Sequence, residues 1–158
     1  MPTQRTFSTY DPARVIVSYM GADLHGFAEG TFIEVERAED GFSSKVGATG
    51  DVVRTKNNNH MGKVTITLMA ASSSNDDLVG FYGLDEGLDD FGGGALQIKD
   101  LSGNMTAHAA IAWINKIPKI ERAKESGNVQ WVFECADIEM FPNGNLAEEG
   151  TLTVQQTP

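Results

Sequence analysis

The stretch that decides the fold is Lys63-Val64-Thr65-Ile66-Thr67-Leu68-Met69. Apolar and polar side chains alternate along it, so Val64, Ile66 and Leu68 share one face of an extended chain. Its β-branched residues also suit a pleated surface. The stretch therefore predicts a strand with one buried face and one polar face.

The same period of two recurs on both sides of this strand. Strands are predicted over residues 14–19, 31–37, 95–100, 106–114, 128–135, 138–141 and 152–154. A helix of two to three turns is predicted after Ser72-Ser73-Ser74, with Asp76 and Asp77 near its positive end. The predicted fold is mostly β: an antiparallel β-sandwich or barrel with one short α-helix and a long inter-strand loop.

Length and charge narrow the function classes. The 158 residues predict a single β domain over 1–158, with terminal extensions at 1–11 and 150–158. The chain holds 22 acids and 12 bases, a net charge of −10, which argues against a surface that clamps nucleic-acid phosphates or anionic lipid. The N-terminus has no secretory h-region, so folding in a reducing cytoplasm is expected.

The connection over residues 38–62 is long for a compact domain. It is rich in Gly, Ser and Asn, yet five apolar residues interrupt the polar sequence: Phe42, Val46, Val52, Val53 and Met61. Two interpretations stay open at this point. The segment is either a loop that lies on another surface, such as a second chain, or a loosely packed hairpin extension.

Catalytic and metal-binding patterns are not found. Asp85-Glu86-Gly87-Leu88-Asp89-Asp90 lacks the spacing of a calcium loop and is interpreted as a solvated loop. His25, His60 and His108 lie far apart, and the single cysteine, Cys135, falls on an apolar strand face, as an inert core thiol would. We therefore expect no enzyme activity, no metal and no cofactor.

The predicted strands share a polar side opposite their apolar one. This polar face consists of Glu34, Glu36, Lys63, Thr65, Thr67, Gln130 and Glu134. An ordinary solvated sheet face would look the same. The alternative is a face that lines a wet channel and must not bind what passes through it.

Several segments, in their order along the chain, resemble the tail tube protein of contractile-tailed bacteriophages, which is related in fold to the tube of type VI secretion. The segments that carry the resemblance are 24–33, 36–42, 46–50, 62–68, 74–76, 99–103 and 131–137. Together they cover most of residues 12–145. No single motif is diagnostic, and the shared order carries the resemblance.

The resemblance implies a virion structural protein that forms hexameric rings, stacked head-to-tail into a hollow inner tail tube for DNA ejection. It implies that the polar face lines an acidic lumen and that Phe42, Val46, Val53 and Met61 in the 38–62 loop contact a neighbouring ring. Implied partners are further copies of the chain and the sheath, tape measure, baseplate and tail terminator proteins, while DNA passes without specific binding. Assembly would take place in the host cytoplasm.

Other function classes remain as alternatives. A small-ligand-binding β-barrel would need an apolar pocket with a few polar groups. An enzyme on a β-sandwich would need a cleft in which His25 or His108 meets acids. Another tail or baseplate ring, or a type VI secretion tube component, would share most of the features described above.

Overall fold

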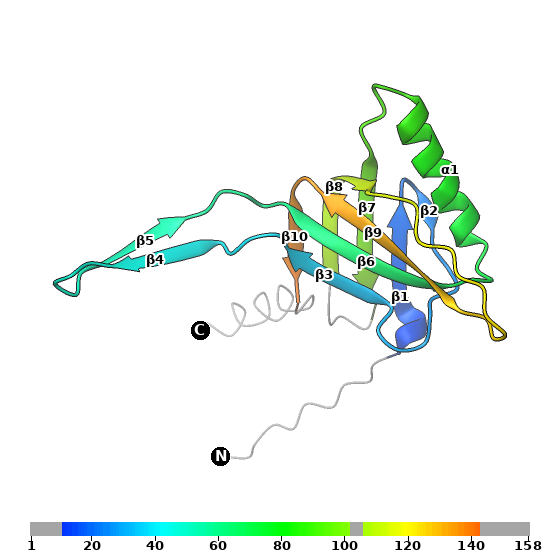
Figure 1. Ribbon diagram of the computed structural model, residues 1–158, viewed down its shortest axis with the longest axis horizontal. Coiled ribbons are helices and arrows are strands. Elements are labelled where there is room, and N and C mark those ends of the chain that lie inside the picture. The colour runs from blue at the N-terminus through cyan, green and yellow to red at the C-terminus, as the bar shows by residue number, and fades with distance from the viewer. Residues whose placement is uncertain (1–10, 102–105, 143–158) are drawn as a thin grey trace, which may run out of the picture.

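The structure, a computed structural model, describes residues 11–101 and 106–142 (Figure 1). These residues form ten strands, one α-helix and one 3-10 helix, η1 (Pro12–Arg14). The helix is α1 (Ser74–Gly87). The strands are β1 (Val15–Tyr19), β2 (Ala22–Asp23), β3 (Ile33–Arg37), β4 (Phe42–Val46), β5 (Val52–Lys56), β6 (Gly62–Met69), β7 (Gly94–Asp100), β8 (Thr106–Ile114), β9 (Asn128–Cys135) and β10 (Ile138–Phe141).

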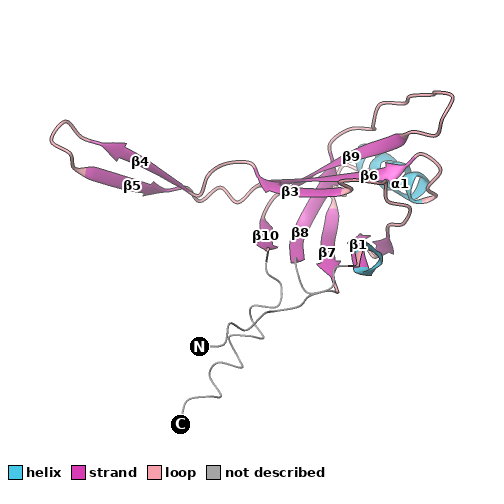
Figure 2. Cartoon of the chain, turned by 90° about the horizontal axis from the view of Figure 1, so that it is seen from below, coloured by secondary structure: helices cyan, strands magenta, loops and turns pink. Residues whose placement is uncertain are grey.

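Eight strands form one antiparallel sheet in the order β2-β1-β7-β8-β9-β6-β3, and β10 pairs with the first half of β8. The pairing partner on this side of β8 changes along the strand: residues 106–109 pair with β10, and Ala112–Ile114 pair with β9. Figure 2 shows that β3, β6 and β9 form one layer, from which β10, β8 and β7 run off at a steep angle. The sheet is therefore bent into two layers, and within the described residues its path ends at β2 and β3 without closing into a barrel.

The core fills the angle between these layers. The alternation in β6 does what the sequence predicts: Val64, Ile66 and Leu68 are fully buried. Across from them, Trp131 and Phe133 of β9 are also buried, each in register with a β6 residue. Burying an apolar side chain of this size contributes about 1.5–3 kcal/mol, so these two strands form the stable centre of the fold.

The helix α1 packs against the core through Leu78, which is fully buried, and Phe81, whose ring meets Tyr19 edge-on at 5.4 Å. Asn75 ties the start of the helix to the sheet. Its amide nitrogen donates to the Met69 carbonyl at 3.0 Å, and its side-chain oxygen accepts a hydrogen bond from Trp131 Nε1 at 2.9 Å. One side chain thus joins the end of β6, the start of α1 and the centre of β9.

The helix is longer than the two to three turns predicted. It has 14 residues and includes Gly80 and Gly83, two residues of low helix propensity on which the prediction of a short helix rested. Each glycine costs the helix about 1 kcal/mol relative to alanine, but packing of Leu78, Phe81 and Tyr82 on the core outweighs this. The start also differs: Ser73 makes no side-chain capping bond, and Ser72 Oγ accepts from the Ser74 N–H at 3.2 Å instead.

The other strands predicted within the described residues are present and differ at their ends, whereas β4 and β5 form where a long inter-strand loop was predicted. The strand expected from residue 14 begins at Val15, because Pro12–Arg14 form η1, and the strand expected from residue 31 begins at Ile33. The mostly β, antiparallel fold class is confirmed. The strand predicted at 152–154 lies outside the described residues.

Candidate functional site: a polar sheet face and a projecting arm

The seven residues of the predicted polar face lie together on three neighbouring strands. The register places Glu36, Lys63 and Glu134 in one row across β3, β6 and β9. Glu34 stands beside Thr65 in the next row, and Thr67 beside Gln130 in the third. Because neighbouring strands orient paired residues to the same side, all seven lie opposite the buried face of β6 and β9. Val132 of β9 pairs with Thr65 on the same side, so one half-buried apolar side chain interrupts the middle row of the polar face.

Sequence reasoning missed one neighbour of this face. Trp113 of β8 pairs with Glu134, which extends the Glu36–Lys63–Glu134 row by one strand. The alternation in β8 is interrupted between Ala109 and Ala112, where the pairing with β7 shifts register. That bulge hides the period of two, so no simple pattern assigned Trp113 to a face.

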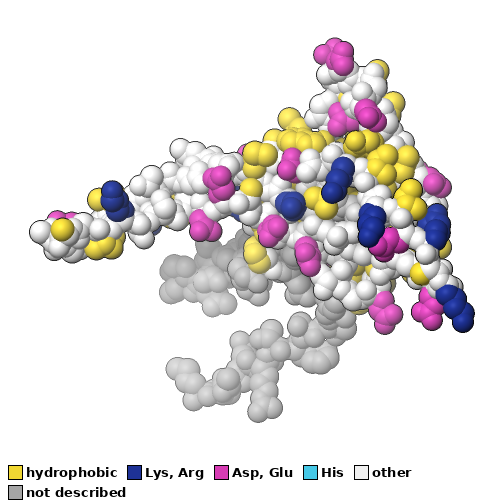
Figure 3. Space-filling model, in the orientation of Figure 1, with side chains coloured by type: hydrophobic (Ala, Val, Ile, Leu, Met, Phe, Trp, Pro, Cys, Tyr) yellow, Lys and Arg dark blue, Asp and Glu magenta, His cyan; other side chains and the backbone are white. Residues whose placement is uncertain are grey.

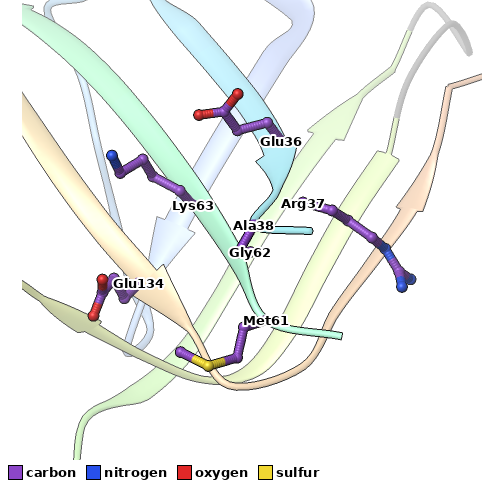
Figure 4. A pocket seen from close by; sticks show the side chains of 7 residues that line it. All are labelled: Glu36, Arg37, Ala38, Met61, Gly62, Lys63 and Glu134. Atoms are coloured by element: carbon purple, nitrogen blue, oxygen red, sulfur yellow. The ribbon is translucent and has the colours of Figure 1, made fainter. Parts of the chain in front are cut away.

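A shallow hollow of about 320 Å³ lies where the polar face meets the start of the 38–62 connection (Figure 4). Its lining residues are Glu36, Arg37, Ala38, Met61, Gly62, Lys63 and Glu134. Figure 4 shows Arg37 directed away from Glu36 and Lys63, and its guanidinium donates to the Ile138 carbonyl at 3.1 Å. The hollow is open and lined by charged groups, unlike the apolar pocket that a small-ligand barrel requires.

The 38–62 connection is a β-hairpin and not an irregular loop. Two short segments, residues 38–41 and 57–61, join the hairpin to the body, and we call them the tethers. β4 and β5 pair over five residues each and form a separate two-stranded sheet. Figures 1 and 2 show this hairpin projecting from the body on the side away from α1. We call residues 38–61 the arm; within its own chain it is a hairpin extension, and its contact with a second chain stays a prediction.

Asparagine side chains organise the root of the arm. The Ala38 N–H donates to the Met61 carbonyl at 2.9 Å, and the Asn57 N–H donates to the Gly41 carbonyl at 2.8 Å. Asn57 Nδ2 also donates to Glu39 Oε2 at 2.7 Å. Hydrogen bonds from Asn57, and then Asn59, lower the pKa of Glu39. The polar Asn57–Asn59 stretch therefore holds the two tethers together.

The hairpin itself is exposed on both faces. All ten residues of β4 and β5 are exposed, and Phe42 is 52% exposed, Val46 and Val52 65% each, and Val53 63%. The pairing places Phe42, Ser44, Val46, Val52, Arg54 and Lys56 on one face, which we call the aromatic face. Ser43, Lys45, Val53 and Thr55 lie on the opposite face. Of the four predicted ring-contact residues, Phe42 and Val46 therefore share a face, Val53 lies behind them, and Met61 sits at the arm root.

The groups that could carry other chemistry are dispersed. Within residues 11–101 and 106–142, no three His, Cys, Asp or Glu side chains are close enough together to hold a metal ion. His60 Nδ1 lies 3.6 Å from Asp137 on the surface. Burial raises the pKa of Cys135 to about 11, so its reactive thiolate is disfavoured, as expected of a core thiol.

None of the helices that the structure describes has the length and hydropathy needed to cross a membrane.

The fold and sequence are similar to those of known phage and injection-system proteins. The solved cap that terminates the tube of the anti-feeding prophage aligns with a TM-score of 0.57 and 9% identity, over 89% of this chain and 96% of the cap. A chain of the sheath–tube complex of the PVC extracellular contractile injection system aligns with a TM-score of 0.55 and 10% identity, over 85% of this chain and 92% of that one. At such low identity these likenesses show a shared fold.

Sequence comparison gives the family. The structural protein ORF10 of Pseudomonas phage KPP10 is 30% identical over 145 residues, which are 87% of this chain and 84% of the relative. The profile described as the Bacteriophage PhiTE tail tube protein matches residues 12–142. The chain therefore belongs to the PhiTE tail tube protein family and is a structural protein of a phage tail.

Proposed function

We propose that six copies of this chain close into a ring, that rings stack head-to-tail into the inner tube of a contractile tail, and that DNA passes through the tube into the host. The observation that carries this proposal is the open edge of β3 beside the polar face. Thr67 N–H donates to the Phe32 carbonyl and Ala38 N–H to the Met61 carbonyl, each at 2.9 Å. In an antiparallel strand the N–H and C=O groups of successive residues point alternately to the two neighbouring strands. Because Phe32 and Ala38 bond towards β6, the N–H and C=O groups of Ile33, Val35 and Arg37 point away from β6.

An edge of this kind is a template for another strand. Within the described residues, β3 pairs only with β6, although its free backbone groups run beside the exposed Glu34 and Glu36. Natural proteins cover such edges, because an unpaired edge recruits strands from other chains. A second copy that covers the edge of β3 would continue the polar face from subunit to subunit, and a closed ring would turn that face into the wall of a channel.

The charge on the polar face suits a channel for DNA. Glu34, Glu36 and Glu134 are accompanied by one base, Lys63, so each copy contributes a net charge of −2. A negative wall repels phosphates, whereas a basic wall would bind them and slow their passage. The other predicted lumen residues are the base Lys63 and the uncharged Thr65, Thr67 and Gln130. The three uncharged side chains offer hydrogen bonds and add nothing to the electrostatic potential of a net charge.

The arm supplies the contact between rings in this proposal. Its exposed valines and Phe42 cover nothing in their own chain, and an isolated two-stranded hairpin is marginally stable in water. Seating on a neighbouring ring buries these residues. Met61, 36% exposed at the arm root, would be covered where the arm leaves its own ring.

The remaining parts of the proposal concern partners. Helix α1 lies at the end of the molecule away from the arm and faces the sheath protein. The tape measure, baseplate and tail terminator proteins are further partners in this proposal. The chain acts as one domain, has no catalytic role, and assembles in the host cytoplasm before it enters the virion.

Electron microscopy of the purified protein at high concentration tests the assembly. We expect hollow six-fold rings or stacked tubes. A uniform population of small particles, even after addition of a baseplate fraction that nucleates tails, contradicts ring formation.

Charge reversal tests the channel wall. Replacing Glu34, Glu36 and Glu134 with lysine should slow DNA ejection from assembled particles, because phosphates would then bind the wall. The matched control reverses three exposed acids that lie off both the polar face and α1, namely Asp23, Glu121 and Glu125. Equal ejection rates in the two triple variants would contradict the assignment of the polar face to the channel wall.

A further inference from the structure

The charge of the molecule is divided unequally between the hairpin and the rest of the chain. Residues 42–56 hold the three bases Lys45, Arg54 and Lys56 and one acid, Asp51, for a net charge of +2. All the other described residues together hold eight bases and nineteen acids, for a net charge of −11. The hairpin at the end of the arm is therefore basic, while Glu39 and Asp40 at the root bring the whole arm, residues 38–61, to a net charge of zero. On the face drawn in Figure 3, a basic side chain lies near the end of the arm and acidic side chains lie nearer its root.

The bases of the hairpin are also divided between its faces. Arg54 and Lys56 lie on the aromatic face with Phe42, Val46 and Val52, whereas Lys45 and Val53 lie on the opposite face. The Arg54 guanidinium stands 4.4 Å from the centre of the Phe42 ring, an arrangement that fixes the direction of a long basic side chain. Asp51 is turned into the tip, where Thr49 Oγ1 donates to it at 2.9 Å. The aromatic face thus combines apolar area with positive charge.

We propose that the aromatic face of the hairpin recognises the acidic body surface of a second copy, so that ring stacking is steered by charge and is sensitive to salt. This rests on the proposed function and adds which face of the arm binds and by what chemistry. Phe42, Val46 and Val52 lose water, and Arg54 and Lys56 meet carboxylates of the other copy. Opposite charges on the two surfaces accelerate encounter and fix orientation more than they add affinity.

The structure offers two matched pairs of positions to test this. Lys56→Glu and Lys45→Glu make the same charge change in the same hairpin, on opposite faces. Val52→Asp and Thr55→Asp each place a carboxylate at an exposed position of β5, again on opposite faces. Because all four side chains are exposed, the variants should fold like the parent chain, which circular dichroism and melting temperature verify.

Stacking is measured by sedimentation and electron microscopy over about 0.05 M to about 0.5 M NaCl, a range that shortens the Debye length roughly threefold. For the parent chain we expect stacks to shorten as salt rises while single rings persist. Lys56→Glu and Val52→Asp should raise the concentration needed for stacking by about tenfold, and Lys45→Glu and Thr55→Asp by less than about twofold.

Carbodiimide coupling, which joins amines to touching carboxylates, identifies the partner surface. In tubes mixed from isotopically light and heavy copies, Lys56 should couple to an Asp or Glu outside the arm of another copy. Coupling of Lys56 only to Glu39, Asp40 or Asp51 would overturn the inference. Equal effects within both matched pairs, or stacking that does not weaken in salt, would overturn it also. A parent chain that forms neither rings nor stacks at any salt would instead show that the proposed function itself fails.

Discussion

The strand pairs β6–β9 and β4–β5 are both antiparallel and both contain β-branched residues. They differ in what surrounds their side chains. In β6 every second side chain is buried, and its register with β9 runs over eight residue pairs. In β4 and β5 no side chain is buried. Strands form in both places, but only the first pair gains its stability from burial within the same chain.

The largest expected effect is on the free energy of unfolding, and a Phe→Ala substitution in each strand pair measures it. Phe133→Ala removes a fully buried ring and should lower the free energy of unfolding by about 3–5 kcal/mol. Phe42→Ala removes an exposed ring from the hairpin and should lower it by less than about 1 kcal/mol in the monomer. Urea unfolding of both variants measures the difference, and similar losses would mean that the hairpin is part of the core.

A smaller effect is expected at the junction of helix and sheet. Asn75→Ala leaves the indole N–H of Trp131 without its partner and frees the backbone of the 69–72 turn. We expect a loss of about 1–3 kcal/mol in the free energy of unfolding. Hydrogen exchange should quicken at α1 and β9 and stay unchanged in β4 and β5; faster exchange in the hairpin would show that arm and body are coupled.

Alkaline pH should weaken the body and spare the arm. Burial raises the pKa of Tyr19 to about 12 and that of Cys135 to about 11. Both groups keep their protons in the folded state at a pH where the unfolded chain loses them, so stability falls as pH rises from about 9 towards 11. Melting temperature against pH measures this, and Cys135→Ala should flatten the curve. An unchanged slope in that variant would assign the alkaline loss elsewhere.

The smallest effect concerns the outer face of α1. A Cβ added at Gly80 or Gly83 meets nothing within 4 Å, so alanine fits at either position without strain. Gly80→Ala and Gly83→Ala should each stabilise the body by about 0.5–1 kcal/mol. Thermal unfolding measures the gain; a loss would show that the helix depends on the flexibility of these glycines.

Periodicity predicted the body well because the two layers bury alternate residues of β6 and β9. The polar face could be predicted for the same reason: Glu134 alternates with buried residues, and Glu34 and Glu36 alternate with half-buried ones. Trp113 could not, because a bulge in β8 breaks the alternation. The helix was underestimated, since the packing of Phe81 and Tyr82 on the core is a tertiary effect that glycine propensity does not contain.

The arm was the segment least determined by sequence. Its apolar residues follow no period that a core would impose, because the body of its own chain does not contact them. The assignment of Phe42 and Val46 to one face and Val53 to the other depends on the register of β4 with β5, which in turn depends on the tight tip at 47–51. Loop residues alone do not reveal that register.

The two tethers at the arm root have a mechanical consequence. Each tether is a short segment outside the β-strands, and a few hydrogen bonds around Asn57 connect the two. The body, in contrast, is held together by a continuous sheet. If arms link successive rings, bending a tail deforms these tethers before it deforms any ring. The stiffness of the assembled tail then depends on the root asparagines, and a long tube can flex while its bore keeps a constant width.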